Sequence, residues 1–572
     1  MPSREEIVAA LTASGPLELT DDVSLGYPLR VYRHAPASLR EVLTSTLAYG
    51  ERPFLIYEDE TLSYRKHYGK VAALAQRLLD GGVVKGDRVA IGMRNYPEWS
   101  ISWWACQAIG AIAVALNAWW TGPELAFALQ DATPAALLID GERLERLASL
   151  IPQLDLKLVL VARRGGATAG GEDFADAVAS PLAELPAAEV GPADLATILY
   201  TSGTTGNPKG AMATHRNHVT NLMNTLLGGA AARTVAGLPT IADPNAAQPG
   251  SLQTFPFFHI GGLSGLYIGA AMGSKLALMY KWSPLEAVGL IEAHKLTSVA
   301  GVPIVVRQLL ETARGAGVGM ESLVGVASGG APVPPDLIRR IGEQFQAKAS
   351  PGNGYGLTET TSAVIANGGP DYLAHPDSVG RPVATADVRV VDENGRDVAG
   401  GEVGEIWIRG PNVIPGYWNN PQATEAAFGG GWFRTGDLGL RDEAGLYYVV
   451  DRMKDVIIRG GENVYCAEVE AALLEHPRVR DAAVVGLPHQ DYGEEVAAVI
   501  QVSAEDLADQ VAEQIRESLA GRLARFKIPT AIRLTEGELP RTATGKILKR
   551  ELRDRYFIEA PGSVSAPDRP IG

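Results

Sequence analysis

The chain has 572 residues, more than one hydrophobic core normally organises, so at least two domains are expected. Hydrophobic residues make up 46% of the chain and charged residues 20%, the composition of an ordinary globular protein. The net charge of −15, with no lysine-rich or arginine-rich block, argues against nucleic acid or anionic membrane as a partner. Two cysteines far apart in sequence, Cys106 and Cys466, suit a reducing compartment and supply neither a disulfide framework nor a metal cluster.

The first residues, Met-Pro-Ser-Arg-Glu-Glu, lack the apolar core of a secretory signal, so a cytoplasmic protein is expected. One uncharged stretch, residues 99–120, is as long as a membrane span, roughly 20 residues. Polar residues interrupt it, and its pattern favours a buried helix, a turn at Gly110 and a buried strand. We therefore predict no transmembrane segment. The oligomeric state is not readable from the sequence, and a homodimer remains open.

Apolar strands alternate with amphipathic helices in the first part of the chain. The expected strands are residues 87–93, 111–116, 135–139, 156–161 and 195–201. This alternation predicts an α/β fold with mostly parallel sheets. Two stretches, residues 165–171 and 240–250, are predicted to be surface loops.

The sequence pattern changes after residue 384 to short β-rich segments, residues 388–392 and 404–409, which predict a small β subdomain. A separate α+β domain is expected over the last ~115 residues. Its predicted strands are residues 456–459, 482–485 and 496–502, and a helix is predicted to bury one face. That face consists of Leu507, Val511, Ile515 and Leu519. Residues 561–572 are predicted to be a disordered tail.

Residues 202–210, Ser-Gly-Thr-Thr-Gly-Asn-Pro-Lys-Gly, form a glycine- and hydroxyl-rich loop after the strand 195–201. With Thr214 as the cap of a following helix, we expect the loop at a strand-to-helix junction. Its backbone N–H groups, its hydroxyls and the Lys209 ammonium could hold phosphates. The alternative is a polar surface turn. The loop differs from G-x-x-x-x-G-K-[ST], because Pro208 precedes the lysine and Gly210 follows it.

Four further segments carry chemistry. In residues 352–360, Tyr355 could stack on a base, Thr358 could bond a phosphate, and Glu359 could hold Mg²⁺, which favours oxygen ligands. Asp437 could accept hydrogen bonds from ribose hydroxyls. The alternatives are a solvated glycine-rich turn for the first and a simple turn residue for Asp437. Residues 451–463 could be only a charged linker, and Lys546 an exposed lysine before the terminal helix.

In content and order, these segments resemble the motifs of the acyl-adenylate-forming superfamily, in the branch of the acyl-CoA synthetases. The resemblance spans roughly residues 50–555, and residues 201–209 and 541–546 are its most specific parts. It implies a large N-terminal domain of three subdomains over residues 1–450, a hinge at 451–455 and a small mobile C-terminal domain over 456–560. It implies ATP, Mg²⁺ and coenzyme A as cofactor and co-substrates, with Glu359 as metal ligand. Residues 329–331 and 353–355 would enclose adenine, and Asp437 and Arg452 would take the ribose hydroxyls. It implies catalytic roles for Lys546, which would reach the substrate carboxylate and the α-phosphate, and for Glu359. The implied nucleotide-binding residues are Thr201, Ser202, Gly203, Thr204, Thr205, Gly206, Lys209, Gly329, Gly330, Ala331, Asn353, Gly354, Tyr355, Gly356, Thr358, Asp437, Arg452, Lys454, Gly460 and Gly461, with Lys454 at the hinge.

The resemblance also bears on the acid and the acceptor. Amino-acid-activating members carry an aspartate where this chain reads Phe255-Pro-Phe-Phe-His-Ile-Gly-Gly262, so a non-amino acid is favoured. His259 is a further candidate catalytic residue: it is expected to gate or line an apolar acyl pocket, and action as a base is the alternative. The other expected lining residues are Phe258, Gly262, Leu263, Val302, Gly329 and Gly354.

No carrier-protein segment follows the C-terminal domain, so a free acceptor such as coenzyme A is expected. Phe526 matches an aromatic that stacks on the coenzyme's adenine in some relatives. However, Ile528 and Thr530 stand where those relatives have basic residues, so Lys527 or Arg459 could meet the phosphates instead.

We therefore expect an ATP-dependent carboxylic acid–coenzyme A ligase for a medium- or long-chain fatty acid or a similar hydrophobic acid. Two alternatives stay open. The first is a ligase that passes its adenylate to an amine or a carrier protein, and the second is a nucleotide-binding protein without turnover.

Overall fold

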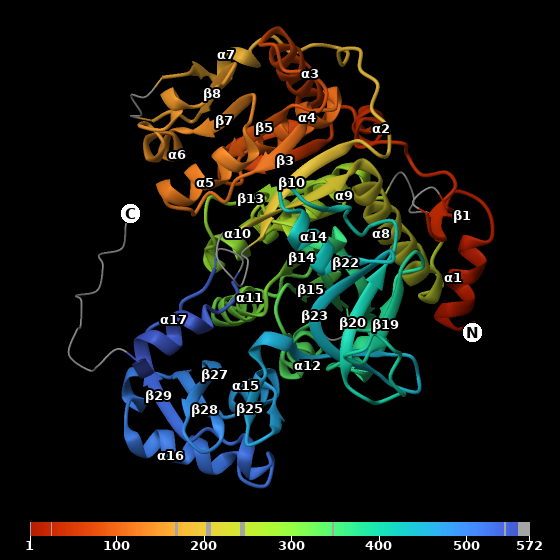
Figure 1. Ribbon diagram of the computed structural model, residues 1–572. Helices are drawn as coiled ribbons and strands as arrows, with labels where there is room; N and C mark the ends of the chain where they lie inside the picture. The colour runs from red at the N-terminus through yellow and green to blue at the C-terminus, as the bar shows by residue number, and fades with distance from the viewer. Residues whose placement is uncertain are drawn as a thin grey trace. The chain divides into compact units, whose positions relative to one another are not determined.

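The structure is a computed structural model that describes residues 2–23, 26–165, 170–201, 208–240, 246–345, 348–542 and 545–558. The chain divides into two compact units. The first comprises Met1–Val333, Leu337–Arg389 and Trp407–Thr435, and the second comprises Pro334–Asp336, Val390–Ile406 and Gly436–Gly572. Both contain strands and helices, which confirms the predicted α/β class (Figure 1). The domain boundaries at residues 450 and 456 stay predictions.

The first unit contains an eight-stranded sheet with the order β21-β11-β10-β6-β5-β7-β8-β9. From β10 to β9 the neighbouring strands are parallel, whereas β11 is antiparallel to both β10 and β21. Helix α5 packs on one face through Leu125 and Leu129, against Val114 and Leu137. Helices α3 and α4 pack against each other beside the sheet (Figure 1). The elements are β5 (Arg88–Gly92), β6 (Ile112–Ala115), β7 (Ala136–Asp140), β8 (Leu158–Ala162), β9 (Glu172–Asp173), β10 (Leu195–Thr201), β11 (Lys209–Thr214), β21 (Gly416–Tyr417), α3 (Tyr64–Asp80), α4 (Pro97–Ile109), α5 (Gly122–Ala132), α6 (Gly141–Arg146), α7 (Phe174–Ala177) and α8 (His215–Val235).

The uncharged stretch over residues 99–120 folds as its pattern predicts. It forms α4, a turn in which Gly110 takes a left-handed φ of 72°, and then β6. A residue with a side chain would be strained at this φ, which explains the glycine. Every residue of α4 except Glu98 is buried. No helix within the described ranges is long and apolar enough to cross a membrane.

The second sheet of this unit has nine strands in the order β18-β17-β16-β15-β14-β12-β13-β3-β4. Strands β3, β13, β12, β14, β15 and β16 are parallel, so their carboxyl ends lie at one edge. Apolar side chains of α10, α11 and α12 share one core with Leu252, Val299 and Val326 of the sheet. The elements are β3 (Pro53–Tyr57), β4 (Glu60–Ser63), β12 (Gly250–Gln253), β13 (Lys275–Leu278), β14 (Ser298–Gly301), β15 (Gly325–Gly329), β16 (Ser350–Leu357), β17 (Ser362–Gly368), β18 (Arg381–Pro382), α9 (Ile260–Ala271), α10 (Pro284–His294), α11 (Pro303–Gly315), α12 (Pro335–Gln344) and α13 (Gly369–Ala374).

Three buried histidines lie among the helices of the first unit: His67 on α3, and His215 and His218 on α8. Burial lowers the pKa of His67 and His218 to about 3 and that of His215 to about 4, from 6.5. One ring nitrogen of each has a partner: Ser100 Oγ for His67, the Leu39 N–H for His215 and Thr197 Oγ1 for His218. All three are therefore neutral core residues near pH 7.

Two further parts of the chain contain helices and strands: the N-terminal residues and the β-rich segment after residue 384. Among the strands of the β-rich segment, Phe428 pairs with Phe433 in the first unit, and Asp437 with Arg452 in the second. The predicted strands at 388–392 and 404–409 are present as β19 and β20. The elements are α1 (Arg4–Thr12), β1 (Leu19–Asp22), β2 (Leu29–Tyr32), α2 (Leu39–Ser45), β19 (Asp387–Val391), β20 (Gly404–Arg409), α14 (Pro421–Ala427), β22 (Phe428–Gly429), β23 (Trp432–Arg441) and β24 (Tyr447–Arg452).

The C-terminal part of the second unit is a sheet with the order β26-β25-β28-β27, in which β29 pairs in parallel with β28. Val469 and Leu473 of α15 and Ile515 of α16 share one hydrophobic core with residues of this sheet. Leu552 of α17 belongs to a second, smaller core with Ala483 of β27 and Val499 of β28. The elements are η4 (Met453–Asp455), β25 (Ile457–Arg459), β26 (Glu462–Val464), α15 (Cys466–Leu474), β27 (Asp481–His489), β28 (Gly493–Gln501), α16 (Asp509–Ser518), β29 (Ala531–Thr535) and α17 (Lys549–Arg553).

Two local predictions are wrong. The glycine-rich loop does not lead directly into a helix: β11 follows it, antiparallel to β10, and α8 begins only at His215, capped by Thr214 as predicted. The two strands that flank the loop, β10 and β11, thus pair with each other. In the terminal domain, Val511, Ile515 and Leu519 are buried, but Leu507 precedes α16 and is 45% exposed.

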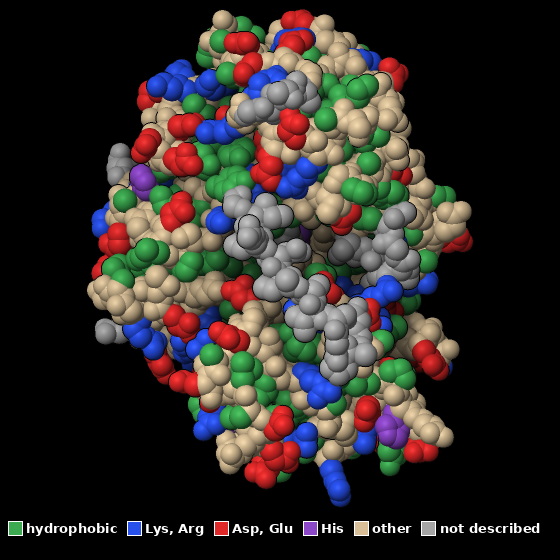
Figure 2. Space-filling model, turned by 90° about the vertical axis from the view of Figure 1, so that its left-hand side faces the viewer, with side chains coloured by type: hydrophobic (Ala, Val, Ile, Leu, Met, Phe, Trp, Pro, Cys, Tyr) green, Lys and Arg blue, Asp and Glu red, His purple; other side chains and the backbone are tan. Residues whose placement is uncertain are grey.

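Acidic and basic side chains are interspersed over the described surface that Figure 2 shows, and Lys and Arg do not gather there into one large patch. Both cysteines are free and buried.

Candidate active site

The carboxyl edge of the second sheet gathers most of the residues predicted to bind adenine and the acid. In the parallel register Gln253 lies opposite Ala300, Gly301 opposite Ser328, and Gly329 opposite Gly354. The loops after β12, β14 and β15 therefore begin side by side. They carry His259, Val302, Gly330 and Ala331, as expected for a ligand site at the ends of parallel strands.

Glycines at this edge allow close backbone approach. A Cβ atom on Gly356 would lie 2.0 Å from the Ser362 carbonyl oxygen, and one on Gly354 would lie 2.8 Å from the Ala363 Cβ. Residues 353–355, predicted to enclose adenine, are part of β16 and pair with β17 rather than forming a turn. Gly330 has a φ of 77°, and a Cβ there would sit 3.6 Å from both Phe255 and Val302.

Lys209, Glu359 and Tyr417 lie together although they are far apart in sequence. Tyr417 Oη donates a 2.8 Å hydrogen bond to Glu359 Oε1, and Lys209 Nζ lies 5.2 Å from the centroid of the Tyr417 ring. Three strands produce this meeting: Lys209 pairs with Thr201 across β10 and β11, and Tyr417 pairs with Ala211 across β11 and β21. The stem of the predicted phosphate loop thus lies beside the predicted magnesium ligand.

Glu359 is held by its backbone as well as by Tyr417. It lies in a 3₁₀ turn, Thr358–Thr360, whose Glu359 carbonyl accepts a 2.9 Å hydrogen bond from the Ile414 N–H. The next residue, Thr360, is fully buried, and its hydroxyl accepts from the Leu357 N–H at 2.8 Å. Thr358 itself is partly buried. The carboxylate therefore projects from an anchored turn.

Tyr417 had no predicted role, because nothing in its local sequence marks it. Burial, and then the neighbouring Glu359 carboxylate, raises the pKa of the Tyr417 hydroxyl, so it remains a hydrogen-bond donor at neutral pH. Only the pairing of β21 with β11 shows its place. The neighbouring loop residues Ser202, Gly203, Thr204, Thr205 and Gly206 lie outside the described residues.

His259 caps helix α9. Its Nδ1 accepts a hydrogen bond from the Gly261 N–H at 3.1 Å, and its ring lies nearly parallel to Phe255, at 21° with 6.2 Å between centroids. With Nδ1 acting as an acceptor, the proton of the neutral ring belongs on Nε2. The place of His259 in an acyl pocket stays a prediction.

In the second unit, the two residues predicted to bind ribose form an ion pair. Asp437 and Arg452 are directly opposite across β23 and β24, with Arg452 Nε 3.0 Å from Asp437 Oδ1. The Asp437 side chain is only 4% exposed, whereas that of Arg452 is 37% exposed. The buried carboxylate is thus fixed in a strand and not in a turn, and the arginine faces solvent in part.

The segment predicted as hinge and linker is structured. Lys454 lies in η4, between β24 and β25. Gly460 and Gly461, with φ of 62° and 87°, form the turn between β25 and β26, which pair antiparallel. Two consecutive positive φ values explain both glycines as hairpin residues. Their predicted part in nucleotide binding stays a prediction.

Lys546 is exposed and stands three residues before α17. Its N–H donates to Thr542 Oγ1 at 3.1 Å, and its carbonyl accepts from the Thr542 N–H at 2.7 Å. Arg541, which is ion-paired with Asp481, bridges to Ile547. The lysine therefore sits on a short loop that is tied to the terminal fold at both ends.

The chain is similar to known enzymes in sequence. A family model described as AMP-binding enzyme matches residues 44–418, and one described as AMP-binding enzyme C-terminal domain matches residues 468–546. Feruloyl-CoA synthase from Amycolatopsis sp is 35% identical over 496 residues, 86% of this chain and 94% of that protein. Long-chain-fatty-acid–CoA ligase FadD13 from Mycobacterium tuberculosis is 33% identical over 511 residues, 88% of this chain and 96% of that protein.

Solved structures agree. O-succinylbenzoate coenzyme A synthetase from Bacillus subtilis, in complex with ATP and magnesium ion, superposes with a TM-score of 0.73 at 30% identity, over 90% of this chain and 99% of that one. The amide bond synthetase McbA from Marinactinospora thermotolerans gives 0.77 at 28% identity, over 91% of this chain and 100% of that one. With both family models matched and relatives aligned over nearly their whole length, the chain belongs to the AMP-binding enzymes, the acyl-adenylate-forming superfamily that its motifs predicted.

Proposed function

We propose that the chain is an AMP-forming carboxylic acid–coenzyme A ligase. It would join an acid to AMP from ATP with release of pyrophosphate, and then pass the acyl group to coenzyme A with release of AMP. The observation that carries the proposal is the contact of Tyr417 with both Glu359 and Lys209. The contact brings a carboxylate and an ammonium together beside the stem of one glycine-rich loop. A carboxylate suits magnesium, and an ammonium suits the phosphates of the nucleotide.

In the first step the acid's carboxylate oxygen bonds to the α-phosphorus of ATP, and the bond to pyrophosphate breaks. Both reactants are anions, so cations that neutralise them lower the barrier. We assign Lys209 to the departing phosphates, and Lys546 to the carboxylate and α-phosphate. Asp437 and Arg452 are assigned to the ribose hydroxyls, since a strand-fixed carboxylate is a good acceptor for two hydroxyls.

The residues present fit a magnesium ion. Among the described residues no group of three or more His, Cys, Asp or Glu side chains could form a cage. Magnesium accompanying a nucleotide commonly takes one or two carboxylates, with the rest of its shell from phosphates and water. Glu359 can supply that carboxylate, and the ion would add positive charge beside the phosphates.

The acid is proposed to be hydrophobic and without an α-amino group. Phe255, Val302 and Gly330 meet at the sheet edge, and residues 255–262 contain no carboxylate to pair an ammonium group. A medium- or long-chain fatty acid is the first candidate, with aryl acids as the alternative. FadD13 and feruloyl-CoA synthase, named for these two kinds of acid, are about equally similar to the chain.

One observation favours an alternative acceptor. Lys527, one of two cations considered for the phosphates of coenzyme A, is ion-paired with Glu468, with Nζ 2.8 and 2.7 Å from its two carboxylate oxygens. The second candidate function is therefore a ligase that passes its adenylate to an amine or carrier protein. Location in the cytoplasm and a homodimeric state stay predictions from the sequence.

The test is a pyrophosphate-release screen over fatty, aryl and steroid-like acids, with and without coenzyme A. Acid-dependent pyrophosphate release is expected in both arms, and AMP with an acyl thioester only when coenzyme A is present. If pyrophosphate is released but no thioester forms with coenzyme A, and an amide forms when amines are added, the second candidate function is selected. No pyrophosphate with any acid would refute both.

A further inference from the structure

A single buried amide holds the turn that carries Phe255 and His259. Asn95 Nδ2 donates to the Phe255 carbonyl at 3.0 Å, and Asn95 Oδ1 accepts from the Phe257 N–H at 2.8 Å. Asn95 is 8% exposed and lies after β5, in the first sheet, whereas the turn follows β12, in the second sheet. One side chain thus satisfies a donor and an acceptor of a backbone 160 residues away.

The turn is enclosed on its other sides too. The His259 N–H donates to the Pro256 carbonyl at 3.0 Å, and the buried Phe257 ring lies 5.2 Å from Trp99 of α4. A Cβ on Gly262 would lie 2.2 Å from the Pro256 carbonyl oxygen. Gly262 was expected to line the pocket, but this close approach already requires a glycine there. The turn therefore has room for little movement while Asn95 stays in place.

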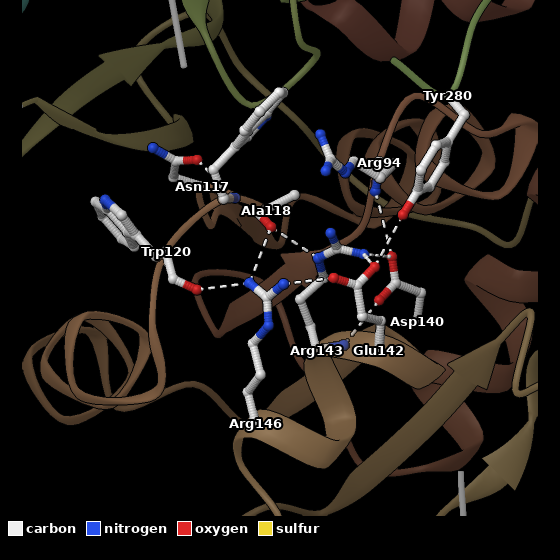
Figure 3. A network of polar contacts seen from close by, with 10 residues as sticks. Arg94, Asn117, Ala118, Trp120, Asp140, Glu142, Arg143, Arg146 and Tyr280 are labelled. Atoms are coloured by element: carbon white, nitrogen blue, oxygen red, sulfur yellow. Dashed lines mark hydrogen bonds and ion pairs between the residues drawn. The ribbon is translucent and has the colours of Figure 1, made fainter. Parts of the chain in front are cut away.

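The residue before Asn95, Arg94, belongs to a polar cluster around the buried Arg143 at the ends of β5, β6 and β7 (Figure 3). Arg143, with no exposed side-chain area, lies 2.9 Å from both Asp140 and Glu142 and donates to the Ala118 carbonyl at 2.8 Å. The N–H of Arg94, the residue before Asn95, points at Asp140 Oδ2, 3.4 Å away.

The Arg94 side chain is fixed as well. Its guanidinium lies 4.1 Å from the Trp119 ring centroid and 4.9 Å from that of Tyr280. Tyr280 follows β13 of the second sheet and donates to Glu142 Oε2 at 2.9 Å. The segment that bears Asn95 is therefore anchored to both sheets, which makes it a rigid base for the amide.

We propose that Asn95 is a positioning residue for the acid-binding wall formed by Phe255 and His259. The inference rests on the proposed function for the use of that wall. Asn95 does not touch the acid: it sets the path of the Phe255–Pro256–Phe257 backbone, which bears the Phe255 ring and leads to His259, whose N–H is bonded to the Pro256 carbonyl. Without the amide, one partly buried C=O and one buried N–H lose their partners, and the turn shifts to regain them.

The test compares the wild type with N95A, which removes both bonds, and N95S, which can keep one. The control is N224A, because Asn224 is a buried amide of the same unit that accepts from Tyr32 Oη and Thr385 Oγ1. Two measurements are made on each protein. The first is hydrogen–deuterium exchange of peptides covering residues 251–262. The second is pyrophosphate release with octanoate, dodecanoate, benzoate and ferulate, in separate titrations of acid and of ATP.

In N95A we expect exchange over residues 255–259 to rise about tenfold, and kcat/KM for the best of the four acids to fall about tenfold. The KM for ATP should stay within about twofold, N95S should be intermediate, and N224A should match the wild type in both measurements. The proposal is overturned if hydrogen–deuterium exchange over residues 255–259 is unchanged in N95A, or if it is faster while kcat/KM for the acid is unchanged. It is also overturned if N95A changes the kinetic constants for the acid and for ATP equally.

The two ideas fail separately. If the wild type releases no pyrophosphate with any acid, the proposed function fails. The exchange measurement then still decides whether Asn95 holds the turn, because it needs no substrate.

Discussion

Replacing Tyr417 by phenylalanine should weaken the dependence of the first step on magnesium without removing any charge. The substitution deletes one oxygen atom and keeps the buried ring beneath Lys209. Glu359 then loses its 2.8 Å hydrogen bond. A hydrogen bond to a charged group contributes about 1.5–3 kcal/mol, and water can replace part of it because Glu359 is only partly buried. A net loss of about 1–2 kcal/mol corresponds to roughly a 5- to 30-fold weaker interaction.

The assay is pyrophosphate release at fixed ATP and acid over a titration of magnesium chloride. The magnesium concentration that gives half the maximal rate should rise by about tenfold in Y417F, while the rate at saturating magnesium changes little. Y267F is the matched control: Tyr267 is fully buried and loses a 2.6 Å hydrogen bond from Asn221, without contact to the predicted nucleotide site. An unchanged magnesium midpoint in folded Y417F, or an equal shift in Y267F, would refute the argument that Tyr417 orients the carboxylate.

Three further substitutions test the assigned roles, and a fourth tests the core. K546A should abolish acyl-adenylate formation yet spare thioester formation from supplied acyl-adenylate, and equal loss of both half-reactions in coupled assays would contradict the role. K454P restricts φ at the predicted hinge and should slow one half-reaction much more than the other, so uniform kinetics would count against a hinge. D437A removes a buried acceptor and should raise the KM for ATP about tenfold with little change in the KM for the acid, a pattern that a merely structural residue would not produce. The three buried histidines have folded-state pKa values below 6.5, so their contribution to stability is full above pH 6.5 and is lost as the pH falls toward 4. Each should cost about 1 kcal/mol between pH 7 and pH 5.5. In urea unfolding, H67Q should show a pH dependence smaller by about that amount, and identical pH dependence in both proteins would mean that the pKa of His67 is the same in the folded and unfolded states.

Much of the architecture follows from local sequence, because the burial of a strand or helix leaves a periodic trace in its own residues. The uncharged stretch over residues 99–120 predicts α4, the Gly110 turn and β6, and all three are present. The α/β class and the family follow in the same way, since ordered motifs are local features. The periodic pattern fails where an element ends: Leu507 continues the spacing of α16 but lies before it and faces solvent.

The partners of the site residues are instead a product of tertiary structure. The motif identifies Lys209 and Glu359 one at a time, but only the order of β10, β11 and β21 brings Tyr417 between them. The glycine-rich loop looks like a helix entrance from its sequence, because six residues are too few to show that β11 pairs back on β10. Asn95 carries no signal at all in its own neighbourhood. A hydrogen bond to a backbone 160 residues away depends on how two sheets pack. Local sequence determines the conformation of its own segment, but it does not show which distant segment that segment will contact.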